Sequence, residues 1–212
     1  MAIQMNKIIS IVLFLVVGLY GCAQHAIPEI PVSSDSVSAG TSVTRAGKAK
    51  DLIGSPITVG DKLPNIILMD RLMRPRALDD FRGKTVLLSI SPSLDTQVCE
   101  RQTHLLGDVS EKELPQDIVR VALTRDLPFA HGRFAEQTGF FQITYLSDYK
   151  NADFGQQTGL LMDDLRLLAR AVMVIDKTGT IRYIQVVPEV GHLPDMDKAF
   201  SIARKINSEI NN

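Results

Sequence analysis

Short apolar runs and segments with helical periodicity alternate along this chain from Leu52 to its end. An apolar run of four to eight residues between turn residues predicts a buried strand, whereas apolar residues at every third or fourth position predict a helix with one buried face. Strands are expected at residues 57–59, 66–69, 85–90, 118–124, 143–146, 171–175 and 181–187. Helices or helical turns are expected at residues 78–84, 97–114, 128–137 and 195–210, and a loop or helical turn at 154–159.

The last two expected strands flank Asp176-Lys177-Thr178-Gly179-Thr180, a sequence typical of a β-hairpin turn. The earlier strands alternate with helices, so the order predicts a mixed sheet with helices on both faces. We therefore expect the α/β class with a thioredoxin-like fold, in which a central mixed β-sheet is flanked by helices and preceded by an N-terminal β-hairpin.

The first 22 residues have the pattern of a targeting segment. Lys7 precedes an apolar run, residues 8–20, which is short for a membrane span but has the length of a signal-peptide core. The run ends at Leu19-Tyr20-Gly21-Cys22, which resembles the lipobox of bacterial lipoprotein signals, although Tyr20 is bulkier than the small residue usual there. The resemblance implies a lipid on Cys22 and an anchor in the bacterial cell envelope, on the periplasmic or another extracytoplasmic face. An ordinary secretory signal or anchor with an incidental cysteine is the alternative.

Composition divides the chain into three parts. Residues 1–21 are the predicted lipoprotein signal peptide. Residues 22–49 are rich in Ser, Ala, Thr, Gly and Pro and predict a flexible tether. Residues 50–212 are expected to form one domain. With 23 Lys and Arg against 24 Asp and Glu, nothing indicates a nucleic-acid surface, and lipid rather than charge would hold the protein on an anionic membrane.

Cys99 follows an apolar strand and opens the helical segment. Thr96 is a good N-cap, which places Cys99 in the first turn of the helix, where free N–H groups and the helix dipole favour a thiolate over a thiol. Pro92 stiffens the loop that enters the helix. The alternative is that Cys99 is a small buried hydrophobic residue without chemistry; the polar neighbours Asp95 to Gln97 argue against this. Because Cys22 and Cys99 form no CxxC motif or Cys/His cluster, we expect no zinc site, disulfide framework or cofactor.

Four motifs, in order along the chain, resemble those of the peroxiredoxins and, within them, the thiol peroxidase subfamily. The most specific is Pro92-Ser93-Leu94-Asp95-Thr96-Gln97-Val98-Cys99, with the pattern Pro-x-x-x-Thr-x-x-Cys. The others are residues 59–64 (Val-Gly-Asp-Lys-Leu-Pro), residues 126–130 (Asp-Leu-Pro-Phe-Ala) with Arg133-Phe134 downstream, and residues 169–172 (Ala-Arg-Ala-Val). The resemblance extends from about residue 43 to residue 210 and so covers the whole expected domain.

The resemblance implies a role for each of four residues. Cys99 would be the peroxidatic cysteine, whose thiolate attacks hydrogen peroxide or an organic hydroperoxide and becomes a sulfenic acid. Thr96 would hydrogen-bond the peroxide, and Pro92 would shield the site from water. Arg170 would hold the thiolate anionic and stabilise charge on the leaving oxygen. A surface arginine at the start of a strand is the alternative for Arg170. The resemblance also implies a homodimer.

One position departs from the subfamily's pattern. A resolving cysteine usually follows the Arg-Phe pair directly, and here that position is Ala135. With Cys22 lipidated, no second thiol remains, so we expect an external thiol reductant, either thioredoxin-like or small. Arg133 would support the site or pair with an acidic neighbour, and His104 and His131 are expected to be solvated.

Two other functions compete with a lipid-anchored, one-cysteine peroxidase. A non-catalytic thioredoxin-fold lipoprotein would sense peroxide or bind a partner through the same pocket. A disulfide oxidoreductase is disfavoured because the chain has no CxxC pair.

Overall fold

The computed structural model describes residues 29–209. The predicted signal peptide and Cys22 lie outside the described residues. The centre of the domain is a seven-stranded sheet with the strand order β10-β9-β5-β6-β7-β3-β4. Its strands are β3 (Ile67–Asp70), β4 (Pro75–Ala77), β5 (Val86–Ile90), β6 (Val119–Thr124), β7 (Thr144–Ser147), β9 (Ala171–Ile175) and β10 (Ile181–Val186). Strands β5, β6 and β7 are parallel and the other pairs are antiparallel, which confirms the predicted mixed sheet.

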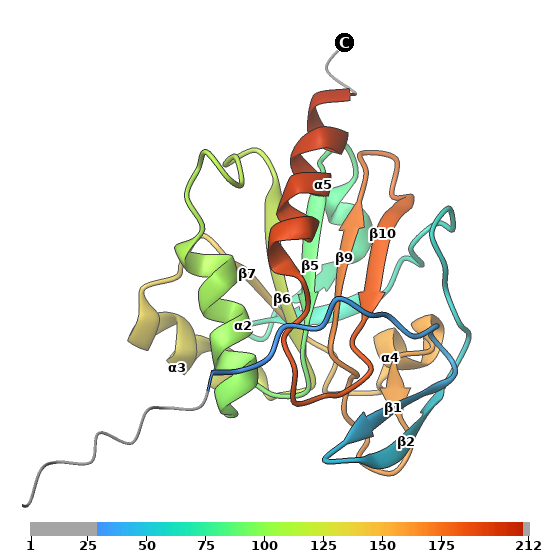
Figure 1. Ribbon diagram of the computed structural model, residues 1–212. Coiled ribbons are helices and arrows are strands. Elements are labelled where there is room, and N and C mark those ends of the chain that lie inside the picture. The colour runs from blue at the N-terminus through green and yellow to red at the C-terminus, as the bar shows by residue number, and fades with distance from the viewer. Residues whose placement is uncertain (1–28, 210–212) are drawn as a thin grey trace, which may run out of the picture.

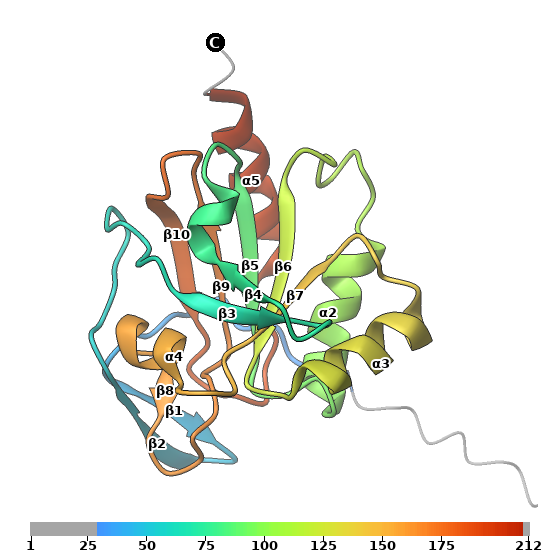
Figure 2. The same cartoon turned by 180° about the vertical axis from the view of Figure 1, so that it is seen from behind.

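Helices cover both faces of this sheet. One face carries α2 (Gln97–Asp108), α3 (Pro128–Thr138) and α5 (Met196–Glu209) (Figure 1). The other carries the 3-10 helix η1 (Leu78–Phe81), α4 (Asp153–Thr158) and a small sheet (Figure 2). That small sheet has the order β1-β2-β8 and consists of β1 (Ser42–Arg45), β2 (Lys48–Ile53) and β8 (Leu161–Met162).

The central strand β5 is apolar throughout because both of its faces are covered. Leu87 packs with the helices of the first face, and its neighbour Leu88 packs into the core on the opposite face. Successive side chains of a strand point to opposite faces, so a strand between two helical layers has no polar side. All five residues of β5 are buried, which explains why its run was readable as a strand.

Residues 29–49 are folded onto the domain, although residues 22–49 were predicted to form a flexible tether. Residues 29–37 run along the edge strand β10 and the loop that follows it. The Ser33 amide donates to the Leu193 carbonyl over 2.8 Å, and the Val37 amide donates to the Val186 carbonyl over 3.0 Å. Residues 42–53 form the β1–β2 pair, which is the N-terminal hairpin of the fold. The composition of residues 29–37 gave no signal of their structure, because their partners lie about 150 residues away in sequence.

Two further expectations about local structure are wrong. Residues 57–59 form no strand. Helix α2 ends at Asp108 rather than near Leu114, because the loop after it turns back under the buried guanidinium of Arg120. That guanidinium donates to the Leu114 carbonyl over 2.9 Å and to the Leu106 carbonyl at the helix end over 3.3 Å. Within residues 29–209, no helix is long and apolar enough to cross a membrane.

Candidate active site

Strand register brings the predicted site residues to one end of the sheet. Ile90, the last residue of β5, pairs with Ala171 of the antiparallel β9 and with Leu123 of the parallel β6. The loop after Ile90 leads to Cys99, and Arg170 directly precedes Ala171. The register therefore places Arg170 beside the loop that carries the cysteine, although 71 residues separate the two in sequence.

Cys99 lies at the third position of α2 and is completely buried. Thr96 is the N-cap residue by its extended backbone, as predicted, but its side chain makes no capping hydrogen bond. Its hydroxyl lies 2.9 Å from the sulfur of Cys99 and 3.2 Å from the Ser93 carbonyl. The hydroxyl has one proton, so a donor shared between the sulfur and a carbonyl replaces the usual cap.

Arg170 is 1% exposed, which excludes the surface-arginine alternative. Its three donor groups have separate acceptors: Nη2 donates to the sulfur of Cys99 over 3.3 Å, Nε to the Val190 carbonyl over 2.9 Å, and Nη1 to Oε1 of Gln102 over 2.6 Å. Among the described residues, no carboxylate forms an ion pair with this guanidinium. The guanidinium is therefore held by one sulfur, one side-chain amide oxygen and one main-chain carbonyl.

Gln102 holds Arg170 in place and was not found from the sequence. It lies one turn after Cys99 on α2 and is completely buried. While its carbonyl oxygen accepts from Arg170, its amide nitrogen donates to the hydroxyl of Ser89 over 2.8 Å and to the Ile90 carbonyl over 3.2 Å. Gln102 thus links the arginine to strand β5. A polar residue in a helix predicted to be amphipathic gave no signal that it would face inward.

The loop before Cys99 is fastened to α3 and to the loop that precedes it. Pro92 is buried at the start of this loop. The Leu94 amide donates to the carboxylate of Asp126 over 2.7 Å, and the carboxylate of Asp95 lies 3.1 Å from Arg133 of α3. Of the two roles predicted for Arg133, pairing with an acidic neighbour is therefore the one observed.

His131 is buried, and the expectation that it is solvated is wrong. Its ring packs against Tyr145 of β7, and Nε2 lies 2.8 Å from the hydroxyl of Thr124. Within the described structure, Nδ1 has no hydrogen-bond partner. Burial lowers the pKa of His131 from 6.5 to about 4, against the opposing charges of Asp126 and Asp95. His104 is partly exposed and lies 3.2 Å from Asp108.

Ala135, at the position expected for a resolving cysteine, is completely buried on α3. It belongs to the same apolar cluster as Leu94 of the cysteine loop. A side chain at this position therefore faces the core beneath that loop rather than solvent.

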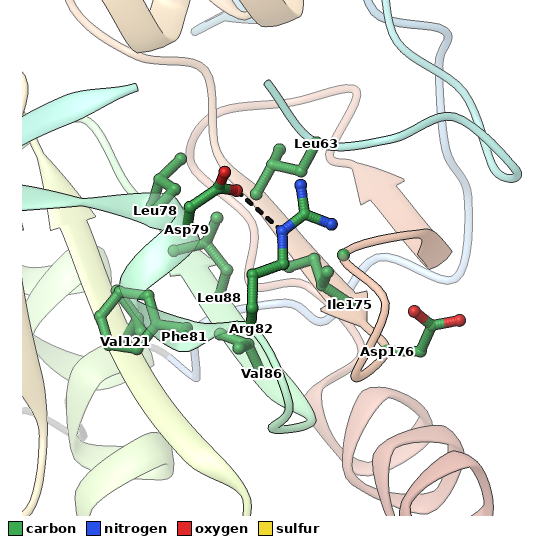
Figure 3. Close-up of a pocket in the computed structure, with 11 residues that line it drawn as sticks. Leu63, Leu78, Asp79, Phe81, Arg82, Val86, Leu88, Val121, Ile175 and Asp176 are labelled. Carbon is green, nitrogen blue, oxygen red and sulfur yellow. Dashed lines mark hydrogen bonds and ion pairs between the residues drawn. The ribbon is translucent and has the colours of Figure 1, made fainter. Parts of the chain in front are cut away.

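A small cavity lies at the end of the sheet opposite to this site and has no part in it (Figure 3). Its volume is about 20 Å³, which is room for about one water molecule. Leu88, Phe81 and Ile175 are among its walls, and the Arg82–Asp79 ion pair, 2.8 Å long, lies at its edge. No group of three or more His, Cys, Asp or Glu residues in the described part of the chain is placed to hold a metal ion.

Comparisons with known proteins agree on one family. Residues 58–200 match the family model described as Redoxin. The chain is 37% identical over 163 residues to a thiol peroxidase of Halalkalibacterium halodurans, covering 77% of this chain and 97% of the relative. It is 36% identical over 166 residues to a thiol peroxidase of Staphylococcus epidermidis, covering 78% and 99%. Among solved structures, a peroxiredoxin-like protein from Aquifex aeolicus is similar with a TM-score of 0.73 and 28% identity, covering 80% of this chain and 98% of that one. These likenesses confirm the predicted thioredoxin-like fold.

The lowered pKa of His131 predicts a pH dependence of stability. The unfolded chain protonates this histidine near pH 6.5 but the folded protein only near pH 4, so between these values the unfolded state binds more protons. The free energy of unfolding should fall as the pH is lowered through this window, by at most about 1.4 kcal/mol per pH unit from this group, and the contribution is fully present above about pH 7.

The measurement is urea unfolding of wild type and His131→Gln from pH 4.5 to 8. Groups common to both proteins cancel in the difference between the two free energies. That difference should be constant above pH 7. Below pH 6.5, the free energy of unfolding of wild type should fall relative to that of His131→Gln. A difference that does not vary with pH would show that His131 titrates alike in both states.

Proposed function

Because the chain belongs to the redoxin family and within it to the thiol peroxidases, we propose that Cys99 is its peroxidatic residue. The activity of the chain is thiol-dependent reduction of hydroperoxides. The named relatives do not favour the alternative of a non-catalytic sensor or binding protein. Hydrogen peroxide and organic hydroperoxides both contain the O–O bond that this chemistry breaks.

In the proposed reaction, the Cys99 thiolate attacks the terminal oxygen of the peroxide. A sulfur–oxygen bond forms, the O–O bond breaks, and the sulfur is oxidised to a sulfenic acid while the leaving oxygen takes a proton and departs as water or alcohol. Thr96 donates to the peroxide, because its hydroxyl already lies within reach of the sulfur. Pro92 excludes water from the loop in which it is buried.

The observation that carries this assignment is the buried guanidinium of Arg170 without a carboxylate partner. Its Nη2 contacts the sulfur, so the same group stabilises the thiolate before attack and the charge on the leaving oxygen during it. Gln102 and the Val190 carbonyl fix the plane of the guanidinium. The orientation of the Arg170 guanidinium is therefore set before the peroxide binds.

Arg170→Lys should slow oxidation of Cys99 by hydrogen peroxide about tenfold or more. The substitution keeps the charge but loses the planar fork that contacts the sulfur and Gln102 together. Stopped-flow measurement of the oxidation rate gives the result, with Arg45→Lys on the exposed strand β1 as the control that should leave the rate unchanged. An unchanged rate in Arg170→Lys would reduce Arg170 to a structural residue.

We propose that an external thiol completes the cycle. Cys99 is a free buried cysteine, and the position of the expected resolving thiol is the buried Ala135. A thioredoxin-like protein or a small thiol would attack the sulfenic sulfur, form a mixed disulfide with loss of water, and leave Cys99 reduced after attack by a second thiol. Without such a thiol, excess peroxide would oxidise the sulfenic acid further to sulfinic acid.

Ala135→Cys should change the product of one equivalent of peroxide. Intact mass spectrometry of wild type should show one added oxygen, whereas the variant should show the loss of two hydrogens, provided that α3 opens enough to bring the sulfurs together. Ala203→Cys, buried on α5, is the matched control and should retain the added oxygen. A rapid internal disulfide in the mature wild-type protein would contradict the proposal, because it would require Cys22 to be a free thiol.

We also propose that Cys22 carries a lipid and holds the protein on the extracytoplasmic face of a bacterial membrane. The support is the sequence Leu19-Tyr20-Gly21-Cys22 at the end of the apolar run. Cys22→Ser should release the protein from the membrane fraction or block its maturation, while peroxide reactivity of Cys99 is unchanged. Membrane fractionation measures this, and normal processing with retained membrane binding in the variant would refute the lipid.

A second copy of the chain is proposed to cover the exposed apolar side chains around α3. Leu127 and Phe129 at the start of this helix are 54% and 66% exposed, and Phe141 just beyond its end is 60% exposed. Such a grouping around one helix is typical of an interaction surface. It adjoins the loop that Arg133 ties to the active site.

Phe129→Glu should convert the proposed homodimer to a monomer, because a carboxylate would be buried without a partner in the interface. Sedimentation velocity gives the oligomeric state. Val59→Glu, which places the same charge at a comparably exposed apolar residue elsewhere, should remain dimeric. Persistence of the dimer in Phe129→Glu would assign the interface to another surface.

A further inference from the structure

The ordered N-terminal segment, residues 29–37, forms a strap across the end of the sheet where the candidate active site lies. The side-chain amide of Gln185 donates to the Ser33 carbonyl over 2.8 Å and to the Asp35 carbonyl over 3.1 Å. The Ser36 hydroxyl accepts from the Val186 amide over 3.0 Å. Together with the main-chain bonds to Leu193 and Val186, these contacts fix where the chain leaves the domain.

The strap begins beside the first turn of α2. Glu29 and Ile30 line a groove of about 700 Å³ together with Gln97 and Glu100, on the outer face of that turn. Cys99 is on the inner face of the same turn, where it is buried against Arg170. In Figure 1 the blue segment starts next to the end of α2 that follows β5. The strap is bonded to Val186, which pairs with Ala171 next to Arg170, so the strap and the sulfur of Cys99 lie at the same end of the sheet. The small cavity of Figure 3 is at the other end.

Covalent geometry limits how far this exit can stand from residue 22. Seven peptide units join Cys22 to Glu29, and a fully extended chain advances at most about 3.6 Å per residue, so the span is at most about 25 Å. A tether running to residue 49, as composition predicted, would have allowed about 97 Å on the same basis. The strap removes most of that freedom.

We propose that the strap turns the active-site end of the domain toward the membrane that holds the lipid, so that the end of the sheet that contains Cys99 lies close to the bilayer surface. The inference rests on the proposed lipid at Cys22. It adds an orientation and a partner surface to that proposal, because an anchor alone would leave the domain free to present any face. The surface that meets the bilayer is the first turn of α2 with the start of the strap.

Charge does not hold this surface against the membrane. The groove rim carries the carboxylates Glu29, Glu100, Asp195 and Asp197 against Arg101 and His104. Anionic headgroups would not attract such a rim, so the covalent length must be what keeps the site near the bilayer. The preference of Cys99 for a peroxide in the bilayer over a peroxide in water should consequently change with linker length and not with the fraction of anionic lipid.

The test lengthens the connection and leaves the domain unaltered. Lipidated full-length protein in phosphatidylcholine vesicles is compared with a variant carrying a flexible 20-residue Gly/Ser insertion between Pro28 and Glu29. A matched control carries the same 20 residues after Asn212. For each protein, the rate of Cys99 oxidation is measured with a phosphatidylcholine hydroperoxide confined to the bilayer and with hydrogen peroxide in water.

The ratio of the two rates should fall about sevenfold on insertion, since effective concentration declines with about the three-halves power of linker length, here from 7 to 27 residues. The rate with hydrogen peroxide should stay the same, and the control should keep the wild-type ratio. An unchanged ratio in protein that floats with the vesicles would overturn the membrane-facing orientation alone. Protein that remains in the aqueous fraction would overturn the lipid anchor and the orientation together.

Discussion

The structure depends on one buried charge. Arg170 has its guanidinium in the core of the domain, where an unpaired cation costs several kcal/mol, and no carboxylate of the described residues neutralises it. Its contacts are a sulfur, a side-chain amide and a main-chain carbonyl. In the proposed reaction, Arg170 would use its contact with the sulfur to stabilise negative charge, so the cation that the core must accommodate is also the one that the chemistry would use.

Sheet topology makes this arrangement possible. Cys99 follows a parallel strand and begins a helix, while Arg170 enters the sheet on the antiparallel neighbour of that strand. Both groups therefore lie at the same end of the sheet, because the two strands run in opposite directions. Rigid strands fix the backbone on each side, and the loop between Pro92 and Cys99 is held from α3 and from the loop before it by two contacts. The sulfur is thus positioned by elements whose own order does not depend on a ligand.

The predictable parts of the fold were those governed by local pattern. Buried strands such as β5 are continuous apolar runs, and the turn between β9 and β10 has the Asp-Lys-Thr-Gly-Thr sequence typical of hairpins. Both could therefore be predicted. The strap could not, because Ser33 and Val37 find their partners near residues 186–193. In the site, Cys99, Thr96 and Arg170 belong to recognisable motifs. Gln102 and the buried state of His131 arise only from packing, for which a polar residue in a helix gives no local signal.

The contacts between α3 and the cysteine loop also bear on how this enzyme can evolve. A peroxidase that resolves its sulfenic acid with a thiol on α3 must open that helix in each turnover, so contacts that strengthen the closed form slow it. In the proposed one-cysteine cycle, with alanine at position 135, no such opening would be required of α3. Asp126 and Arg133 can then fasten the loop without a kinetic penalty. In that proposed cycle, the usual trade-off between stability and activity would be relaxed at this helix, and stabilising substitutions could accumulate there.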